Sequence, residues 1–280
     1  MSVNQRLYLT TNDVPFSVPF DAFWTQTSEA ESHELVIVAG SSAFVPVVAT
    51  FSLPASPPTN PKWYIEDLLL GQFVTKPMRA NHGVGSGNSV SLSVSVRVQM
   101  NDDPYPLPNS WLANHQLVVR VYIFDPFDNS LTLLRSQAYW PIMAISDLYR
   151  RGGGMTLPAP FILPEDGSVV LEVGSHLYAY SGYWSIPLNP FDSTAKAEFG
   201  DSAADDLSTS NSDHTQKNPW MQISGLVSAL IPSSQPLPSP LLARRVGRFH
   251  KPLAPTRLAL HMQHPKLPST GDFFGEEILG

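Results

Sequence analysis

The stretch from Ser91 to Met100 constrains the fold of this chain more than any other part of it. Its apolar side chains alternate without a break with serine, arginine and glutamine; the apolar members are Leu92, Val94, Val96, Val98 and Met100. Successive residues of a strand point to opposite faces, so a strand here has one apolar face and one polar face. A helix would scatter the same residues around its surface. The stretch is therefore predicted to be a strand with one face in a core.

A second strand is predicted shortly after the first. Residues 101–104 (Asn-Asp-Asp-Pro) end the first run, because proline cannot donate to a strand ladder and Asn and Asp favour turns. A second, mostly apolar run then extends from Gln116 to Phe124, and Asp125 and Pro126 close it. Two long strands joined by a loop that contains proline are typical of an antiparallel β domain.

The composition fits that interpretation. The 280 residues include 27 prolines, which argue against long helices and for short strands joined by rigid loops. Apolar residues make up 42% and charged residues 15%, so the chain can bury a full core as one large β domain or two small ones. With no cysteine, disulfides, thiolate chemistry and sulfur-ligated metals are excluded. No apolar run reaches the length of a membrane span.

The remaining elements are predicted to be short and irregularly spaced. Strands are expected at residues 34–39, 43–51, 155–162, 168–173, 183–188, 219–231 and 255–262. A short helix is expected over 62–71, ended by Gly71, with one helical turn at 144–148. Residues 191–218 are polar and acidic and are expected to form a long loop. About eight strands with long connections favour a Greek-key sandwich or a jelly roll.

Two motifs that suggest a ligand fail a structural requirement. Gly83, Gly85 and Gly87 superficially resemble a phosphate-binding loop, but such a loop follows a strand and opens a helix, whereas here a strand follows. His261 and His264 could face one metal only on a helix. Prolines bracket that segment, and in a strand these two residues point to opposite faces. No metal site and no cofactor are expected.

The sequence gives little support to catalysis. It contains no Gly-x-Ser-x-Gly elbow and no cysteine nucleophile. Three of its adjacent carboxylate pairs are candidates for a two-carboxylate site: Asp102 and Asp103, Asp205 and Asp206, and Glu276 and Glu277. All of them fall in predicted loops or near the C-terminus, where turn residues are commonly acidic, and spacing alone does not place two of them across a cleft. The chain is not expected to be an enzyme.

A basic segment near the C-terminus is the candidate binding element. Residues 241–266 contain six lysines and arginines and no acid, and they follow a proline-rich spacer at 232–240. The candidate residues are Arg244, Arg245, Arg248, His250 and Lys251. Such an arm can lie along the phosphates of a nucleic acid and release their counterions. It can equally pair with an acidic surface on a neighbouring subunit, and both interpretations stay open.

In their order along the chain, these elements resemble the capsid proteins of picorna-like viruses. Residues 94–101 and 117–124 resemble the C and D strands of that family, 141–148 and 154–161 its helix and E strand, and 183–190 the G strand with its Leu-Asn-Pro exit. The resemblance implies that 34–53 are strand B, 62–71 the helix between B and C, 168–173 strand F, 219–231 strand H and 255–262 strand I.

The resemblance implies a fold, a domain organisation and a function. The fold is an all-β, eight-stranded antiparallel jelly-roll sandwich with one or two short helices and extended terminal arms. The jelly roll spans 34–262, with an N-terminal arm at 1–33 and a C-terminal tail at 263–280. The implied function is that of a structural protein of an icosahedral, pseudo-T=3 virion that assembles in the host cytoplasm. Its partners would be further copies of itself, related capsid proteins, the genomic nucleic acid and a host receptor.

Two alternatives belong to other functional classes. One is a jelly-roll receptor- or carbohydrate-binding protein, such as the tip of a phage fibre or spike. The other is a β-sandwich hydrolase with carboxylates on its loops. Sedimentation separates the first alternative from a coat protein, since large closed particles favour a coat and small trimers favour a fibre tip.

Overall fold

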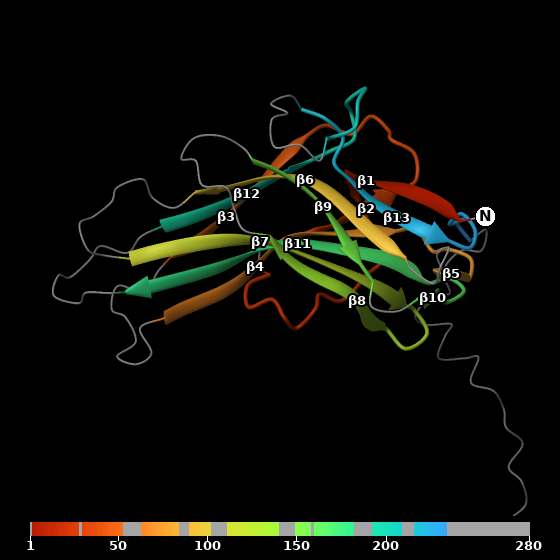
Figure 1. Cartoon of the computed structure of the whole chain (residues 1–280), viewed down its shortest axis with the longest axis horizontal. Coiled ribbons are helices and arrows are strands. Elements are labelled where there is room, and N and C mark those ends of the chain that lie inside the picture. The colour runs from red at the N-terminus through yellow and green to blue at the C-terminus, as the bar shows by residue number, and fades with distance from the viewer. Residues whose placement is uncertain are drawn as a thin grey trace, which may run out of the picture. The chain divides into compact units, whose positions relative to one another are not determined.

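The fold was obtained as a computed structural model, which describes residues 2–27, 30–52, 63–83, 90–101, 111–139, 149–157, 160–181, 192–208 and 216–233 (Figure 1). These residues contain thirteen strands and no helix. Accordingly, none of them forms a helix long and apolar enough to cross a membrane. The strands are β1 (Val3–Asp13), β2 (Ser32–Val36), β3 (Val45–Ser52), β4 (Trp63–Thr75), β5 (Asn81–Gly83), β6 (Ser91–Asn101), β7 (Trp111–Asp125), β8 (Ser130–Tyr139), β9 (Tyr149–Thr156), β10 (Phe161–Leu163), β11 (Ser168–Ser181), β12 (Asp192–Phe199) and β13 (Trp220–Leu226).

The prediction of an all-β fold is confirmed, with more strands than the eight expected. β6 and β7 contain the two runs on which that prediction rested. β11 begins where a strand was predicted at 168–173 and continues to Ser181. The strands predicted at 183–188 and 255–262 and the helical turn at 144–148 lie outside the described residues. So do most of the C-terminal arm and tail, and the domain boundaries remain predictions.

The helix predicted over 62–71 is wrong, because these residues belong to strand β4. Leu68 and Leu70 face the main core, while Leu69 lies in a separate cluster on the opposite face of the strand. A strand that is buried on both faces reads as a continuous apolar run. The period of such a short run does not distinguish it from a helix.

The loop predicted over 191–218 is wrong in its first part, because β12 occupies Asp192–Phe199. Ala195, Ala197 and Phe199 are buried in the core, and Lys196 and Glu198 alternate with them. Alanine and alternating charge gave this segment a polar average, which hid its period of two.

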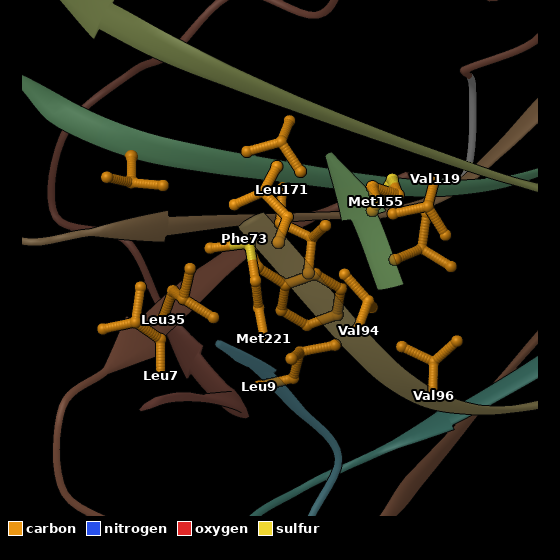
Figure 2. Packing of buried hydrophobic residues seen from close by; sticks show 14 of the residues in the cluster. Leu7, Leu9, Leu35, Phe73, Val94, Val96, Val119, Met155, Leu171 and Met221 are labelled. Carbon is orange, nitrogen blue, oxygen red and sulfur yellow. The ribbon is translucent and has the colours of Figure 1, made fainter. Parts of the chain in front are cut away.

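Two antiparallel layers form the sandwich. One layer has the order β3-β12-β6-β9, and the other has the order β4-β11-β7-β8. The apolar face of β6 points toward the second layer, where it meets β7 and β11 (Figure 2). Each layer turns an apolar face toward the other layer, and the two faces together make one core.

Three further strands close one side of the sandwich. β13 pairs with residues 91–95 of β6, next to the stretch that pairs with β12. β1 then pairs with β13 through residues 3–8 and with β2 through its later residues, and β2 runs parallel to β4. Residues 3–13, which the sequence places in the N-terminal arm, therefore lie inside the sheet. They bury Leu7 and Leu9 in the core.

The space between the layers is filled by hydrophobic side chains. Val94 and Val96 come from β6, Val119 from β7, Leu171 from β11 and Phe73 from β4 (Figure 2). A void of about 10 Å³ beside Phe73 has room for at most one water molecule. The described hydrophobic side chains of the two layers thus pack into one core.

Candidate functional site

An N-terminal strap, defined here as residues 14–27, covers the outer face of the β4-β11-β7 layer. Two of its side chains, Val18 and Trp24, are buried. Val18 packs in a cluster with Val74, Tyr122, Phe124 and Val170, and Trp24 packs in another with Leu69 and Val118. The sequence analysis places these residues in an extended N-terminal arm at 1–33, whereas the structure anchors the strap on its own sheet.

A fully buried carboxylate, Glu172 of β11, lies under the strap. Its Oε2 accepts a hydrogen bond of 2.7 Å from Nε1 of Trp24. Its Oε1 accepts bonds of 3.0 Å from Nε2 of Gln72 and 3.3 Å from the backbone N–H of Asp21. A buried carboxylate without donors would be strongly unfavourable, so this set of donors is what allows the charge at this position.

Arg120 and Tyr122 of β7 complete the network under the strap. Nε of Arg120 donates a 2.6 Å hydrogen bond to the Tyr122 hydroxyl, and its guanidinium lies 4.1 Å from the centre of the Phe23 ring. The same guanidinium is 3.5 Å from the Asp21 carboxylate. Burial raises the pKa of Tyr122, and the nearby charge of Glu172 raises it further, so the hydroxyl stays protonated. These polar groups are engaged in holding the strap.

The sequence carried one signal for this network that its interpretation missed. Glu172 is the one charged residue in the apolar run 169–173, and a charge within a strand that is buried on both faces requires partners. The sequence does not reveal which residues those partners are, because Trp24 and Gln72 lie about 150 and 100 positions away.

Part of the outer face of the other layer, where β6 pairs with β13, is covered by the connection between β12 and β13. The hydroxyl of Ser95, on the polar face of β6, donates to the backbone oxygen of Ser208 at 3.0 Å. Nε1 of Trp220 donates to the backbone oxygen of Leu207 at 2.7 Å. Residues 201–208 thus form a second cover, so both layers carry a segment of their own chain on the outside.

The predicted carboxylate pair Asp205 and Asp206 does not form a two-carboxylate site. Asp206 forms an ion pair with Arg6 and accepts a 3.1 Å hydrogen bond from the Tyr8 hydroxyl. Asp205 lies 4.0 Å from Nζ of Lys217. Burial raises the pKa of Tyr8, and the Asp206 carboxylate adds to the effect. Asp206 therefore attaches the β12–β13 connection to β1.

His33 lies at the side of the sandwich that β1 and β2 close. It is 6% exposed, and its ring packs against those of Phe199 and Phe73, with centroids 4.9 and 5.9 Å away. Its Nδ1 lies 3.9 Å from the Asp13 carboxylate and its Nε2 lies 3.8 Å from that of Glu31. Burial lowers the pKa of His33, and the two carboxylates oppose this without cancelling it.

The pKa of His33 predicts the direction in which pH changes stability. The unfolded chain takes up a proton near pH 6.5, whereas folded His33 does so only at lower pH. This part of the stability is present above pH 6.5 and is lost as the pH falls toward the folded pKa. Chemical denaturation between pH 7.5 and 5 measures how the free energy of unfolding changes with pH. His33→Gln should reduce this slope by at most about 1.4 kcal/mol per pH unit. The exposed His82 offers a control, and an equal reduction in His82→Gln would contradict the assignment.

Few of the other predicted site residues can be placed. The basic arm, Arg244, Arg245, Arg248, His250 and Lys251, lies outside the described residues, as do Gly85, Gly87, His261, His264, Asp102, Asp103, Glu276 and Glu277. Gly83 is described and lies in β5, where a Cβ would overlap the ring of Phe161 on the paired strand β10. That close approach accounts for this glycine. Within the described ranges, no group of three or more His, Cys, Asp or Glu side chains could hold a metal ion.

The fold and its polar groups define a β-sandwich protein whose own segments cover parts of both outer faces. No protein-family model matches the chain, and no curated protein matches it. Among solved structures, the VP2 subviral particle of infectious bursal disease virus aligns at 10% identity and a TM-score of 0.21, over 76% of this chain and 45% of that one. The Gt strain of the same virus aligns at 12% identity and a TM-score of 0.20, over 85% and 50%. TM-scores this low do not establish a common fold, and the chain spans at most half of those proteins.

Proposed function

We propose that this chain is a viral coat protein, in which a single jelly roll forms the wall of an icosahedral shell around a genome. The observation that carries the proposal is the strand order of the two layers. The eight strands are, in chain order, β3, β4, β6, β7, β8, β9, β11 and β12. In one layer β3 pairs with β12, β12 with β6, and β6 with β9, which are the first, eighth, third and sixth of the eight. In the other layer β4 pairs with β11, β11 with β7, and β7 with β8, which are the second, seventh, fourth and fifth of the eight. A jelly roll built from two Greek keys has this order, and the pairing therefore supports the proposal.

In this assignment strand B stays at β3, and the letters after it change. The sequence named residues 94–101 strand C and 117–124 strand D, because it took β4 for a helix. With β4 as strand C, β6 becomes D, β7 becomes E, and β12 becomes the last strand, I. Everything after Phe199 then lies beyond the eight strands of the jelly roll, including β13 and the basic arm.

Jelly rolls occur in viral coats and in lectin-like binding proteins. The hydrophobic core of this chain and its internal hydrogen bonds favour a coat. Its core is filled by hydrophobic side chains from both layers. Three carboxyl groups, of which Glu172 and Asp201 are buried and Asp206 is half-buried, bind the chain to itself. Glu172 holds the strap, Asp206 holds the β12–β13 connection, and Asp201 accepts from the backbone N–H groups of Gly40 and Ser42 at 2.7 and 3.0 Å. A shell subunit needs this kind of internally fastened, rigid body, and its function requires no catalytic group.

The basic arm is proposed to act outside the jelly roll. Arg244, Arg245, Arg248, His250 and Lys251 either lie along genome phosphates or pair with acids of a neighbouring subunit. Nucleic-acid binding by the full chain separates the two, because phosphate contacts give an affinity that falls steeply with salt. A variant with glutamine at all five positions should lose that salt-dependent binding if the arm meets the genome.

The proposal is tested by expressing the full chain and examining it by electron microscopy and sedimentation velocity. The expected result is closed particles of uniform diameter that sediment far faster than a 30.7 kDa monomer. A population of discrete trimers would instead support a fibre-tip or receptor-binding protein. A monomer at every concentration would contradict a coat function.

A further inference from the structure

One end of the described sandwich carries an exposed apolar surface, which we call the end surface. It is formed by the exposed side chains of Arg79, Ala80, His82, Ile162, Val227 and Ile231. They come from β5 with its preceding residues, from β10, and from the segment after β13. In Figure 1 these elements lie together, with β5 and β10 next to each other.

Backbone pairing aligns three members of the end surface in a row. Ile162 of β10 is the register partner of His82 of β5. On the other side, the N–H of Val227 donates to the backbone oxygen of His82 at 3.2 Å. Ile162 is 65% exposed and Val227 is 55% exposed. Ile231, 51% exposed, lies further along, where its backbone oxygen accepts from the N–H of Arg79 at 2.8 Å.

The end surface is held rigidly from behind. Phe161 and Leu163, on either side of Ile162, are buried in the main core, and so is Leu230. The Asn81 side chain donates to the backbone oxygens of Ser228 and Ala229 at 2.8 and 3.2 Å. The apolar side chains are therefore presented by a fixed backbone, which lowers the entropy lost when a partner binds.

The charge of the end surface suits contact with a second copy of the chain. The whole sequence has a net charge of −7, so two copies repel each other on average. The end surface carries one cation, Arg79, and beside it the Glu165 carboxylate accepts from the N–H of Ala80 at 2.9 Å. Identical surfaces that are close to neutral can meet without a large like-charge penalty.

The size of the end surface indicates how such copies associate. From their exposed fractions, the three aliphatic side chains offer on the order of 300 Å² of apolar surface, a patch large enough to be functional on a monomer. A stable pair of proteins buries about 800 Å² on each partner. One contact of this kind is therefore weak alone, and it becomes effective when a closed assembly repeats it many times.

We propose that copies of this chain meet through the end surface, with the same surface of each copy converging around a symmetry axis. The inference rests on the proposed coat function, for which it names a contact between subunits. The outer faces of the sheets offer less room for a partner, because the strap and residues 201–208 cover parts of both layers with the chain's own segments.

The first experiment places a carboxylate in the proposed contact. Ile162→Glu and Val227→Glu should each lower the yield of particles from the full chain at least tenfold, because each buries a charge at every copy of the contact. Ile65→Glu is the matched control, since Ile65 is 54% exposed on β4, outside the end surface, and it should leave the yield within twofold. Circular dichroism should show all three variants folded, because the side chains are exposed.

The second experiment detects the contact even if no particle forms. The chain has no cysteine, so Ile162→Cys and Ile65→Cys each create a single thiol. Under mild oxidation the full chain with Ile162→Cys should form covalent dimers at least tenfold faster than the chain with Ile65→Cys.

The outcomes separate the two proposals. Particles that tolerate Ile162→Glu and Val227→Glu, with equal cross-linking of both cysteine variants, would overturn the end-surface contact and leave the coat function standing. Small oligomers that depend on Ile162, without particles from the wild-type chain, would overturn the coat function and support the contact. A wild-type chain that stays monomeric and cross-links equally slowly at both positions would overturn both.

Discussion

Trp24→Ala should lower the free energy of unfolding by about 3–5 kcal/mol, the range observed when a large buried aromatic side chain is removed. Trp24 is 6% exposed and connects the strap to the β4-β11-β7 layer. The substitution opens a cavity between the two and removes the donor to Oε2 of Glu172. The strap should loosen together with the sheet, because Gln72 and Asp21 donate to the same carboxylate.

Urea denaturation followed by circular dichroism measures this loss, and two further variants interpret it. Trp24→Phe keeps most of the ring but not the N–H, and should cost about 1–3 kcal/mol for the lost partner of a buried charge. Phe127→Ala, at a residue 77% exposed in the turn between β7 and β8, should change stability by less than about 0.5 kcal/mol. Equal losses in Trp24→Ala and Phe127→Ala would contradict the docking of the strap.

Gly174→Ala should destabilise the protein by about 3 kcal/mol, at the upper end of the usual cost of overpacking. Gly174 lies at the irregularity in β11, where the register with β4 shifts. A Cβ there would overlap both the Trp24 ring and the backbone oxygen of Leu68. The ring is held by its bond to Glu172 and the oxygen belongs to the paired strand, so neither can move aside cheaply.

The matched control for Gly174→Ala is Gly154→Ala in β9, where no atom lies within 4 Å of the added Cβ. This second change should be neutral or should stabilise by up to about 1 kcal/mol, because alanine loses less chain entropy than glycine in a strand. Thermal and urea denaturation compare the two variants directly. A neutral Gly174→Ala would show that the strap does not approach β11 as described.

Sequence periodicity predicted the half-buried strands correctly and failed where both faces of a strand are covered. In β6, Val94 and Val96 face the core and alternate with polar residues, so the period of two is visible. In β4, Leu69 is buried by the strap as well, so the alternation disappears and the run resembles a helix. The strap explains the error, because it covers Leu69 and so buries an apolar side chain on the outer face of β4. The sequence does not show that the strap lies there.

For the polar network under the strap, the sequence likewise showed the residues but not their contacts. The sequence contains a charge inside an apolar run, Glu172, and an aromatic segment that needs anchoring, residues 16–24. It contains no sign that the two meet, because their hydrogen bond joins positions almost 150 residues apart. The end surface was missed for a similar reason: Ile162 and Val227 are ordinary apolar residues until β10, β5 and the segment after β13 place them side by side.

By itself, the sequence determined that this protein is built of strands, that a rigid proline-rich chain connects them, and that one face of the central strand is apolar, because these properties depend on neighbouring residues. The tertiary structure alone decided the order in which the strands pair, which segments cover the two layers, and which apolar side chains remain exposed. Those features depend on contacts between residues far apart in the chain, and a side chain is buried or exposed only in relation to the partners that the fold brings to it.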